Sequence, residues 1–131
     1  MSVFAEDVIE SAGCVQICAG HKGGAEAAIH AVRRIYEENE DDAVVLIDAS
    51  NAFNSLNRKA ALHNIGILCP IMHTFSSNLY QTSARLFVLG GAEISSTEGT
   101  TQGSPESMAI YALATVPLLN KLDTLPMQMM L

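Results

Sequence analysis

The sequence is short of basic residues. Only 7 lysines and arginines stand against 14 aspartates and glutamates, which gives a formal net charge of −7. A surface that binds nucleic acid is normally basic, because the release of counterions from phosphates drives such binding. The composition therefore argues against strong binding of nucleic acid by this chain alone.

Long hydrophobic runs are also missing. No run reaches the roughly 18 apolar residues that a membrane-spanning helix needs. The start, Met-Ser-Val-Phe-Ala-Glu-Asp, lacks the basic region of a secretory signal peptide. We therefore expect an intracellular protein, cytoplasmic or nuclear, without a membrane partner. The 131 residues, 49% of them hydrophobic, suit one domain with a single core.

Cysteine is scarce and its spacing is uninformative. Cys14, Cys18 and Cys69 are an odd number without a secreted disulfide pattern, which suits a reducing compartment. Together with His21 and His73 they could be arranged as a zinc site, but their spacings depart from the usual ligand pairs. We expect buried, unreactive thiols instead.

Hydrophobic periodicity predicts a chain rich in helices. The predicted helices cover residues 1–12 (ended by Gly13), 25–39, 56–64 (capped by Asn54 or Ser55 and ended by Gly66), 70–80 (begun by Pro70) and 107–122 (disturbed at Pro117). Two strands, 84–89 and 92–96, are predicted to form a hairpin with a two-residue turn at Gly90-Gly91. Residues 14–18 are expected to be extended. On the helix over 25–39, arginines at 33 and 34 precede glutamates at 37 and 38 by four positions, which indicates a paired, solvated face.

One apolar stretch stops abruptly at a carboxylate. Residues 43–47, Ala-Val-Val-Leu-Ile, are short and rich in β-branched side chains, and Asp48 follows them. This pattern predicts a central strand with Asp48 at its carboxyl end. An ionised carboxylate at the end of a buried strand requires a cation or a hydrogen-bonding shell. Asp48 is therefore the first candidate for chemistry.

Three familiar catalytic or binding motifs are incomplete in this chain. Lys22 stands in a glycine-rich loop, but Gly23 replaces the hydroxyl residue of a phosphate-binding loop. Lys22 stays a candidate phosphate contact, since it precedes a helix N-terminus. Ser104 lacks the flanking glycines of a nucleophile elbow. A phosphatase nucleophile at Asp48 would have a second aspartate two residues on, where this chain has Ser50.

Three segments in order resemble reverse transcriptases of non-LTR-type retroelements. Residues 44–55, Val-Val-Leu-Ile-Asp-Ala-Ser-Asn-Ala-Phe-Asn-Ser, resemble the first palm motif of that family. Residues 98–105, Glu-Gly-Thr-Thr-Gln-Gly-Ser-Pro, resemble the second, and residues 19–34 resemble the finger segment and helix before the palm. The resemblance covers nearly the whole chain. It implies an α+β fold with a small antiparallel sheet packed against helices, in one partial domain over 1–131: a fingers-like part, 1–42, and a partial palm, 43–131.

The resemblance also implies roles for named residues. The family carries out RNA-directed DNA synthesis from deoxynucleoside triphosphates on a template-primer, with two Mg²⁺ ions. Asp48 matches the first metal-binding aspartate, and the carbonyl of Ala49 is a plausible further ligand. Phe53 matches the aromatic gate under the nucleotide sugar, and Gln102-Gly103 matches the loop under nucleotide and template. From the residues alone, Phe53 is also explained as a core aromatic, and Gln102-Gly103 as ordinary turn chemistry.

The family's third palm motif, an aromatic residue followed by Ala-Asp-Asp, is expected to come after residue 131, together with the thumb. One catalytic carboxylate position is thus present, and the isolated chain is expected not to polymerise. Two alternatives stay open. One is a noncatalytic interaction module, such as a decayed retroelement relic that associates through apolar surface. The other is a phosphotransferase of doubly wound α/β fold with Asp48 at a strand end.

Overall fold

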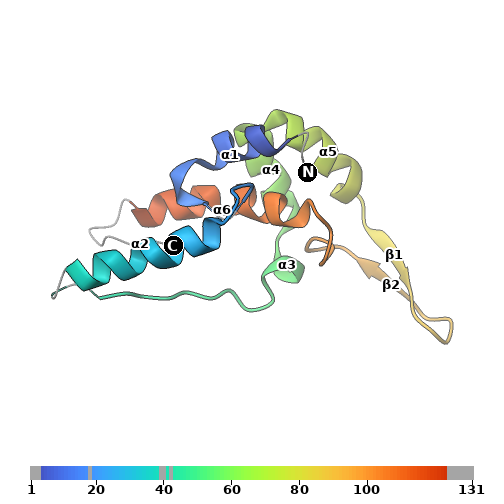
Figure 1. Ribbon diagram of the computed structural model, residues 1–131. Helices are drawn as coiled ribbons and strands as arrows, with labels where there is room; N and C mark the ends of the chain where they lie inside the picture. Colours follow the sequence, from blue (N-terminus) through green and yellow to red (C-terminus); the bar gives the residue numbers. More distant parts are fainter. Residues whose placement is uncertain (1–3, 18, 39–40, 42, 124–131) are drawn as a thin grey trace.

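The computed structural model describes residues 4–17, 19–38, 41 and 43–123 (Figure 1). These residues form six α-helices, a 3-10 helix and a two-stranded antiparallel sheet. The predicted α+β class with a small antiparallel sheet is confirmed. The elements in chain order are α1 Ala5–Ala12, the 3-10 helix η1 Gly13–Val15, α2 Gly24–Glu38, α3 Ala52–Ser55, α4 Arg58–Leu68, α5 Pro70–Tyr80, β1 Ala84–Phe87, β2 Glu93–Ser96 and α6 Ser107–Asp123.

The core lies where helices meet. Helix α6 packs on α4 and α1, and α5 packs on α4. The largest fully buried apolar side chains are Val8, Ile65, Met72, Ile110 and Leu113. Helix α6 is apolar on most sides, which is typical of a helix at the centre of a fold. It runs through Pro117 to Asp123, so the proline does not end it.

The boundaries of α4 differ from the prediction. Its N-cap is Asn57, whose side chain accepts a hydrogen bond from the Ala60 amide at 2.9 Å. Gly66 does not end the helix, because α4 continues to Leu68. A Cβ at Gly66 would lie 3.2 Å from the His73 ring of α5. The glycine therefore serves close packing of the two helices.

The first helix and its exit agree with the prediction only in part. Helix α1 ends at Gly13, whose φ is +62°, as expected. The chain then turns as η1 and is not extended, and this turn lets Val15 pack against the core. Cys14 in η1 is exposed and Cys69 is buried, so burial was predicted correctly only for Cys69. Cys18 lies outside the described residues.

Helix α2 and its surface pairs are confirmed. Arg33 Nε lies 2.7 Å from Glu37 Oε1, and Arg34 Nε lies 2.8 Å from Glu38 Oε1. All four side chains are more than half exposed. Such pairs add little to stability because water screens them.

The strands form the predicted hairpin, but with a longer turn. Ala84 lies opposite Ser96, and Phe87 lies opposite Glu93. The Val88 amide donates to the Ala92 carbonyl at 2.8 Å, which leaves three residues, 89–91, in the loop. The strand residues are exposed apart from Ser96, which is half-buried. The hairpin projects from the helices (Figure 1), and its strand residues other than Ser96 are exposed, so helices in the described part of the chain do not cover the sheet, contrary to the prediction.

Residues 43–47 do not form the predicted central strand. They have no regular secondary structure and are exposed; Leu46, for example, is 89% exposed. A strand needs a neighbour for its backbone N–H and C=O groups. Among the described residues, β1 and β2 pair only with each other, so no strand is left to pair with 43–47. The prediction of a buried strand ending at Asp48 is therefore wrong.

Candidate functional site

The structure brings the two candidate motifs together. We call this contact the motif junction and define it as residues 51–58 together with residues 96–103. The Thr100 amide donates to the Phe53 carbonyl at 2.8 Å, and the Gly99 amide donates to the Leu56 carbonyl at 2.8 Å. The segment after Asp48 and the loop before α6 are thus fixed relative to each other by main-chain hydrogen bonds.

Gly99 allows this close approach. Its φ of +74° lies in the left-handed region, which favours glycine. A Cβ at this position would lie 2.5 Å from the Asn54 carbonyl oxygen and 2.6 Å from the Asn54 Cα. Both the conformation and the contact therefore require a residue without a side chain.

Arg58 holds the junction from the first turn of α4. Its side chain is buried, with Nε donating to the Gly99 carbonyl at 2.7 Å and Nη1 to the Ser96 carbonyl at 2.7 Å. Nη2 donates to Ser96 Oγ at 2.8 Å. The planar fork of the guanidinium suits this set of acceptors, whereas a lysine would offer a single point charge. Arg58 thus ties the end of β2 and the following loop to α4.

Tyr80 and Glu98 extend this arrangement. The guanidinium carbon of Arg58 lies 5.2 Å from the centre of the Tyr80 ring, within the range of a cation–π interaction. The Tyr80 hydroxyl accepts a hydrogen bond from the Thr101 amide at 3.0 Å. Glu98 Oε2 accepts from the Arg58 amide at 3.0 Å. The loop is therefore held by side chains of α4 and α5.

Sequence reasoning missed Arg58, although a signal was present. A cation in the first turn of a helix meets the positive end of the helix dipole. Arg58 is the first residue of α4, directly after the cap Asn57. A basic residue at such a position needs compensating acceptors, and here they come from a loop distant in sequence.

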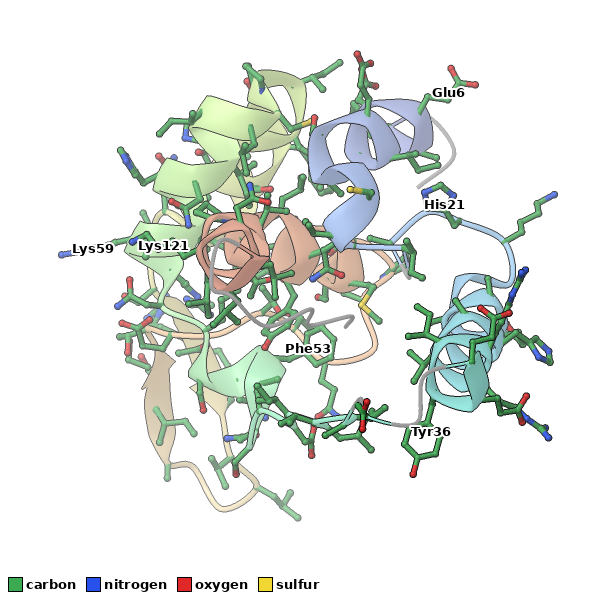
Figure 2. All side chains as sticks on the ribbon, turned by 90° about the vertical axis from the view of Figure 1, so that its left-hand side faces the viewer. Glu6, His21, Tyr36, Phe53, Lys59 and Lys121 are labelled. Carbon is green, nitrogen blue, oxygen red and sulfur yellow. The ribbon has the colours of Figure 1, made fainter. Side chains whose placement is uncertain are left out.

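Phe53 lies on α3 and is half-buried. Its ring centre is 5.2 Å from that of Tyr111 on α6, with the planes inclined by 47°. Figure 2 shows Phe53 between α3 and α6. Neither ring is part of the buried core cluster of the described residues, so Phe53 is not a core aromatic; the pair instead fixes the Phe53 ring beside the motif junction.

Asp48 and Ala49 lie just before α3 and are exposed. Asp48 makes no hydrogen bond or ion pair with any described residue. The turn that leads into α3 contains Asn51, whose φ is +54°. Its Oδ1 accepts from Asn54 Nδ2 at 2.7 Å, and this local bond stabilises the left-handed conformation. The carboxylate of Asp48 is thus open to solvent beside an ordered turn.

The remaining predicted site residues lie on separate loops. Gln102 and Gly103 are exposed in the turn before α6, and the φ of Gly103 is +86°. One residue, Thr101, separates them from Thr100, whose amide is bonded to α3, so they lie within the motif junction. Lys22 is exposed in the loop before α2, and no contact joins it to the junction within the described residues.

The donor set fits part of a magnesium site. Mg²⁺ in proteins is often held by one or two carboxylates together with substrate phosphates. The Asp48 carboxylate and the Ala49 carbonyl are oxygen donors of this kind. The described part of the chain contains no group of three or more histidines, cysteines, aspartates or glutamates that could hold a metal by itself. Asp48 and Ala49 could therefore hold Mg²⁺ only together with ligands from elsewhere, such as phosphate oxygens.

The buried hydroxyl of Thr100 provides a test of the junction. Thr100 Oγ1 has no hydrogen-bond partner among the described residues, whereas Ser107 Oγ donates to the Thr101 carbonyl at 2.6 Å. Thr100→Val removes a polar group that is buried without compensation, so we expect the free energy of unfolding to stay the same or to rise by up to about 1 kcal/mol. Equilibrium unfolding in urea measures this change.

Ser107→Ala is the matched control. It removes a buried hydroxyl that does have an acceptor, so we expect it to lower the free energy of unfolding by about 1 kcal/mol. If Thr100→Val destabilises the protein as much as Ser107→Ala does, the Thr100 hydroxyl has a partner in solution and the geometry described above is wrong.

The observed sheet limits the choice of function. The sheet in the described residues is two-stranded and antiparallel, so it lacks the parallel strands of a doubly wound phosphotransferase. Within the same residues, every helix is too short or too polar to cross a membrane. Comparison with protein-family models, with curated proteins and with solved structures gives no match for this chain.

Proposed function

We propose that this chain is the fingers and palm part of an RNA-directed DNA polymerase that resembles the reverse transcriptases of non-LTR-type retroelements. One observation supports this most directly. The segment that follows Asp48 is hydrogen-bonded through Phe53 to the loop that contains Gln102. These are the two stretches that resemble the first and second palm motifs, and in such an enzyme both must lie beside the same nucleotide.

The roles of the residues follow from their positions. The exposed Asp48 and Ala49 would hold Mg²⁺ together with the triphosphate of a deoxynucleotide. Magnesium, when bound, neutralises charge on the phosphates during nucleotidyl transfer. Phe53 would lie under the sugar, and Gln102-Gly103 under the base and template. Positive φ at Gly103, with open space around it, permits close approach of the backbone to a ligand.

The negative net charge limits how strongly this chain can bind nucleic acid. With a net charge of −7, the chain repels the phosphates of a template-primer. Lys22, beside Gly23 and before α2, is a candidate contact for a single phosphate. The proposal therefore assigns nucleotide positioning to this chain and expects it to bind the template-primer weakly or not at all by itself.

A noncatalytic interaction module is the second candidate. It is favoured by apolar side chains that are exposed on two separate segments: Leu46 is 89% and Leu89 is 103% exposed. Large apolar patches of this kind often mark association sites. The two candidates differ in whether a nucleotide binds at Asp48.

Binding of a metal–nucleotide complex tests the polymerase assignment. Mn²⁺ replaces Mg²⁺ and broadens the NMR signals of nearby amides. We expect Mn²⁺ with a deoxynucleoside triphosphate to broaden the signals of Ala49, Phe53 and Gln102 together. Asp48→Asn removes the charged ligand and should weaken this binding by about tenfold or more, by analogy with the loss of other metal-site groups.

The control is Asp41→Asn, which removes an exposed carboxylate at the other end of residues 43–47. It should leave the broadening pattern and the affinity unchanged. The polymerase assignment is contradicted if the nucleotide causes no broadening at the motif junction, or if the two aspartate variants weaken binding equally.

A further inference from the structure

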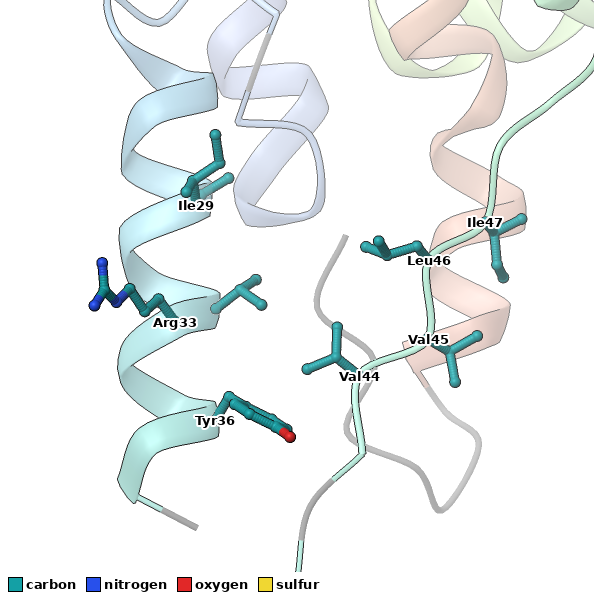
Figure 3. Close-up of a pocket in the computed structure, with 9 residues that line it drawn as sticks. Ile29, Arg33, Tyr36, Val44, Val45, Leu46 and Ile47 are labelled. Atoms are coloured by element: carbon teal, nitrogen blue, oxygen red, sulfur yellow. The ribbon is translucent and has the colours of Figure 1, made fainter. Parts of the chain in front are cut away.

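Residues 43–47, which we call the unpaired segment, have the conformation of a strand without a partner. Figure 3 shows the side chains of Val44 and Leu46 directed towards α2, and those of Val45 and Ile47 directed to the opposite side. This alternation is that of a β-strand. None of the backbone N–H and C=O groups of the segment takes part in a hydrogen bond with a described residue. An extended, unpaired backbone of this kind is a template for pairing with another strand.

An apolar groove lies beside the unpaired segment. Its volume is about 570 Å³. It is lined by Ala28, Ile29, Val32, Arg33 and Tyr36 of α2 and by Val44, Val45, Leu46 and Ile47. Ile29 is 66% exposed and Tyr36 is 58% exposed, so the groove is open to solvent. A strand that pairs with the segment could therefore also bury its side chains against α2.

Carboxylates flank the segment at both ends. Asp41 precedes it and Asp48 follows it; both are exposed, and neither forms an ion pair with a described residue. These charges decide between a second copy of the chain and a different partner. In a two-fold antiparallel pair of two copies centred on Val44 or Val45, Asp48 of each copy falls opposite the acidic residue at position 40 or 42 of the other. A parallel pair in register places Asp48 opposite Asp48.

Both arrangements are unfavourable, because like charges directly opposite each other destabilise a strand pair. Each copy also carries a net charge of −7, which adds repulsion between two chains. Lysine or arginine at both ends of the incoming strand would instead face Asp41 and Asp48. The charges therefore select a partner with a basic residue on each side of an apolar stretch.

We propose that the unpaired segment binds, by strand addition, an extended apolar stretch of a partner protein that carries lysine or arginine at both ends. The main-chain hydrogen bonds of the new strand pair supply affinity, and the groove beside α2 and the flanking aspartates supply specificity. This inference does not depend on the polymerase assignment, because it requires neither a metal ion nor a nucleotide.

A designed peptide tests the proposal. The probe is a capped peptide in which valine and threonine alternate between terminal lysines, added to the 131-residue chain without metal or nucleotide. We expect NMR shifts of the amides of residues 43–48 and of Ile29 and Tyr36 in α2, together with slower hydrogen exchange of every second amide within 44–47, because only alternate amides face the added strand. The same peptide with glutamates in place of lysines should bind about tenfold more weakly or not at all, because its charges repel the flanking aspartates.

Two leucine-to-lysine variants distinguish binding at the unpaired segment from nonspecific binding to exposed apolar side chains. Leu46→Lys places a charge in the unpaired segment and should weaken binding of the lysine peptide by about tenfold or more. Leu89→Lys makes the same change at an exposed apolar site on the hairpin and should leave binding within about twofold. Both side chains are exposed, at 89% and 103%, so neither variant should disturb the core.

Four outcomes would overturn the proposal. They are equal binding of the two peptides, shifts centred on the hairpin, no binding at millimolar peptide, and protection of the 44–47 amides in the chain alone, as a monomer or as a dimer. The last would mean that the segment is already covered by this chain or by its copy. Failure here would leave binding of the manganese–nucleotide complex at Asp48 untouched.

Discussion

Replacing Arg58 with alanine is expected to lower the free energy of unfolding by about 3 kcal/mol. Hydrogen bonds from charged groups are worth about 1.5–3 kcal/mol each, and the substitution leaves their acceptors, one buried and one half-buried, without a donor. The carbonyls of Ser96 and Gly99 would both lose their Arg58 donor. Tyr80 would lose the cation above its ring. Urea unfolding followed by circular dichroism measures the loss, and hydrogen exchange at the Thr100 and Thr101 amides measures local opening of the loop.

Two other arginine variants are the controls for Arg58→Ala. Arg58→Lys keeps the charge but not the fork, so it should recover only part of the loss. Arg33→Ala breaks an exposed pair with Glu37 and should change the free energy of unfolding by no more than about 0.5 kcal/mol. If Arg58→Ala and Arg33→Ala have equal effects, and the Thr100 amide exchanges at the wild-type rate in both, the guanidinium does not hold the junction.

The helical part of the fold could be predicted because its signals are local. The end of α1 at Gly13 and the start of α5 at Pro70 depend on the backbone properties of one residue each. The extent of α2 follows from its apolar spacing within a single stretch. Where a local signal was misleading, a tertiary contact determined where the helix ends. Gly66 signals a helix end, yet it lies inside α4 because the His73 ring packs against it.

Residues 43–47 show the limit of local inference. Their composition correctly indicates an extended backbone, and the side chains alternate as in a strand (Figure 3). Whether such a stretch is buried and paired depends on a second strand, which composition does not identify. In the described residues the candidate neighbours, β1 and β2, are occupied with each other. The same sequence signal therefore produced an exposed, unpaired segment where a core strand was expected.

Only part of the candidate site could be named from the sequence, again because long-range contacts are not visible there. Asp48, Phe53 and Gln102 could be named because their residue types and order match a motif. Arg58 and Gly99 could not, since their roles arise only from contact with each other across 41 positions of sequence. The residues proposed to meet a ligand could thus be named from the sequence, whereas the contacts that bring the two loops together required the structure.

Gly99→Ala is the second substitution with a large expected effect. Strain in the left-handed region costs roughly 1–2 kcal/mol, and the overlap with the Asn54 backbone would break two main-chain hydrogen bonds worth about 1 kcal/mol each. These are the bonds from Gly99 to Leu56 and from Thr100 to Phe53. We therefore expect the free energy of unfolding to fall by about 3–4 kcal/mol in total. Urea unfolding measures it, and hydrogen exchange at Thr100 locates it.

Gly91→Ala isolates the contribution of the contact. Gly91 has a similar φ, +91°, but a Cβ there would meet no atom within 4 Å. It should therefore cost only the conformational strain, roughly 1–2 kcal/mol. The difference in the free energy of unfolding between the two variants measures the cost of the overlap between a side chain at position 99 and the Asn54 backbone.

If the polymerase assignment is correct, Gly99→Ala should also weaken the manganese–nucleotide complex, because it separates Phe53 from Gln102, while Gly91→Ala should not. Equal effects of the two variants on both stability and nucleotide binding would mean that the close approach of the two motifs plays no part in either.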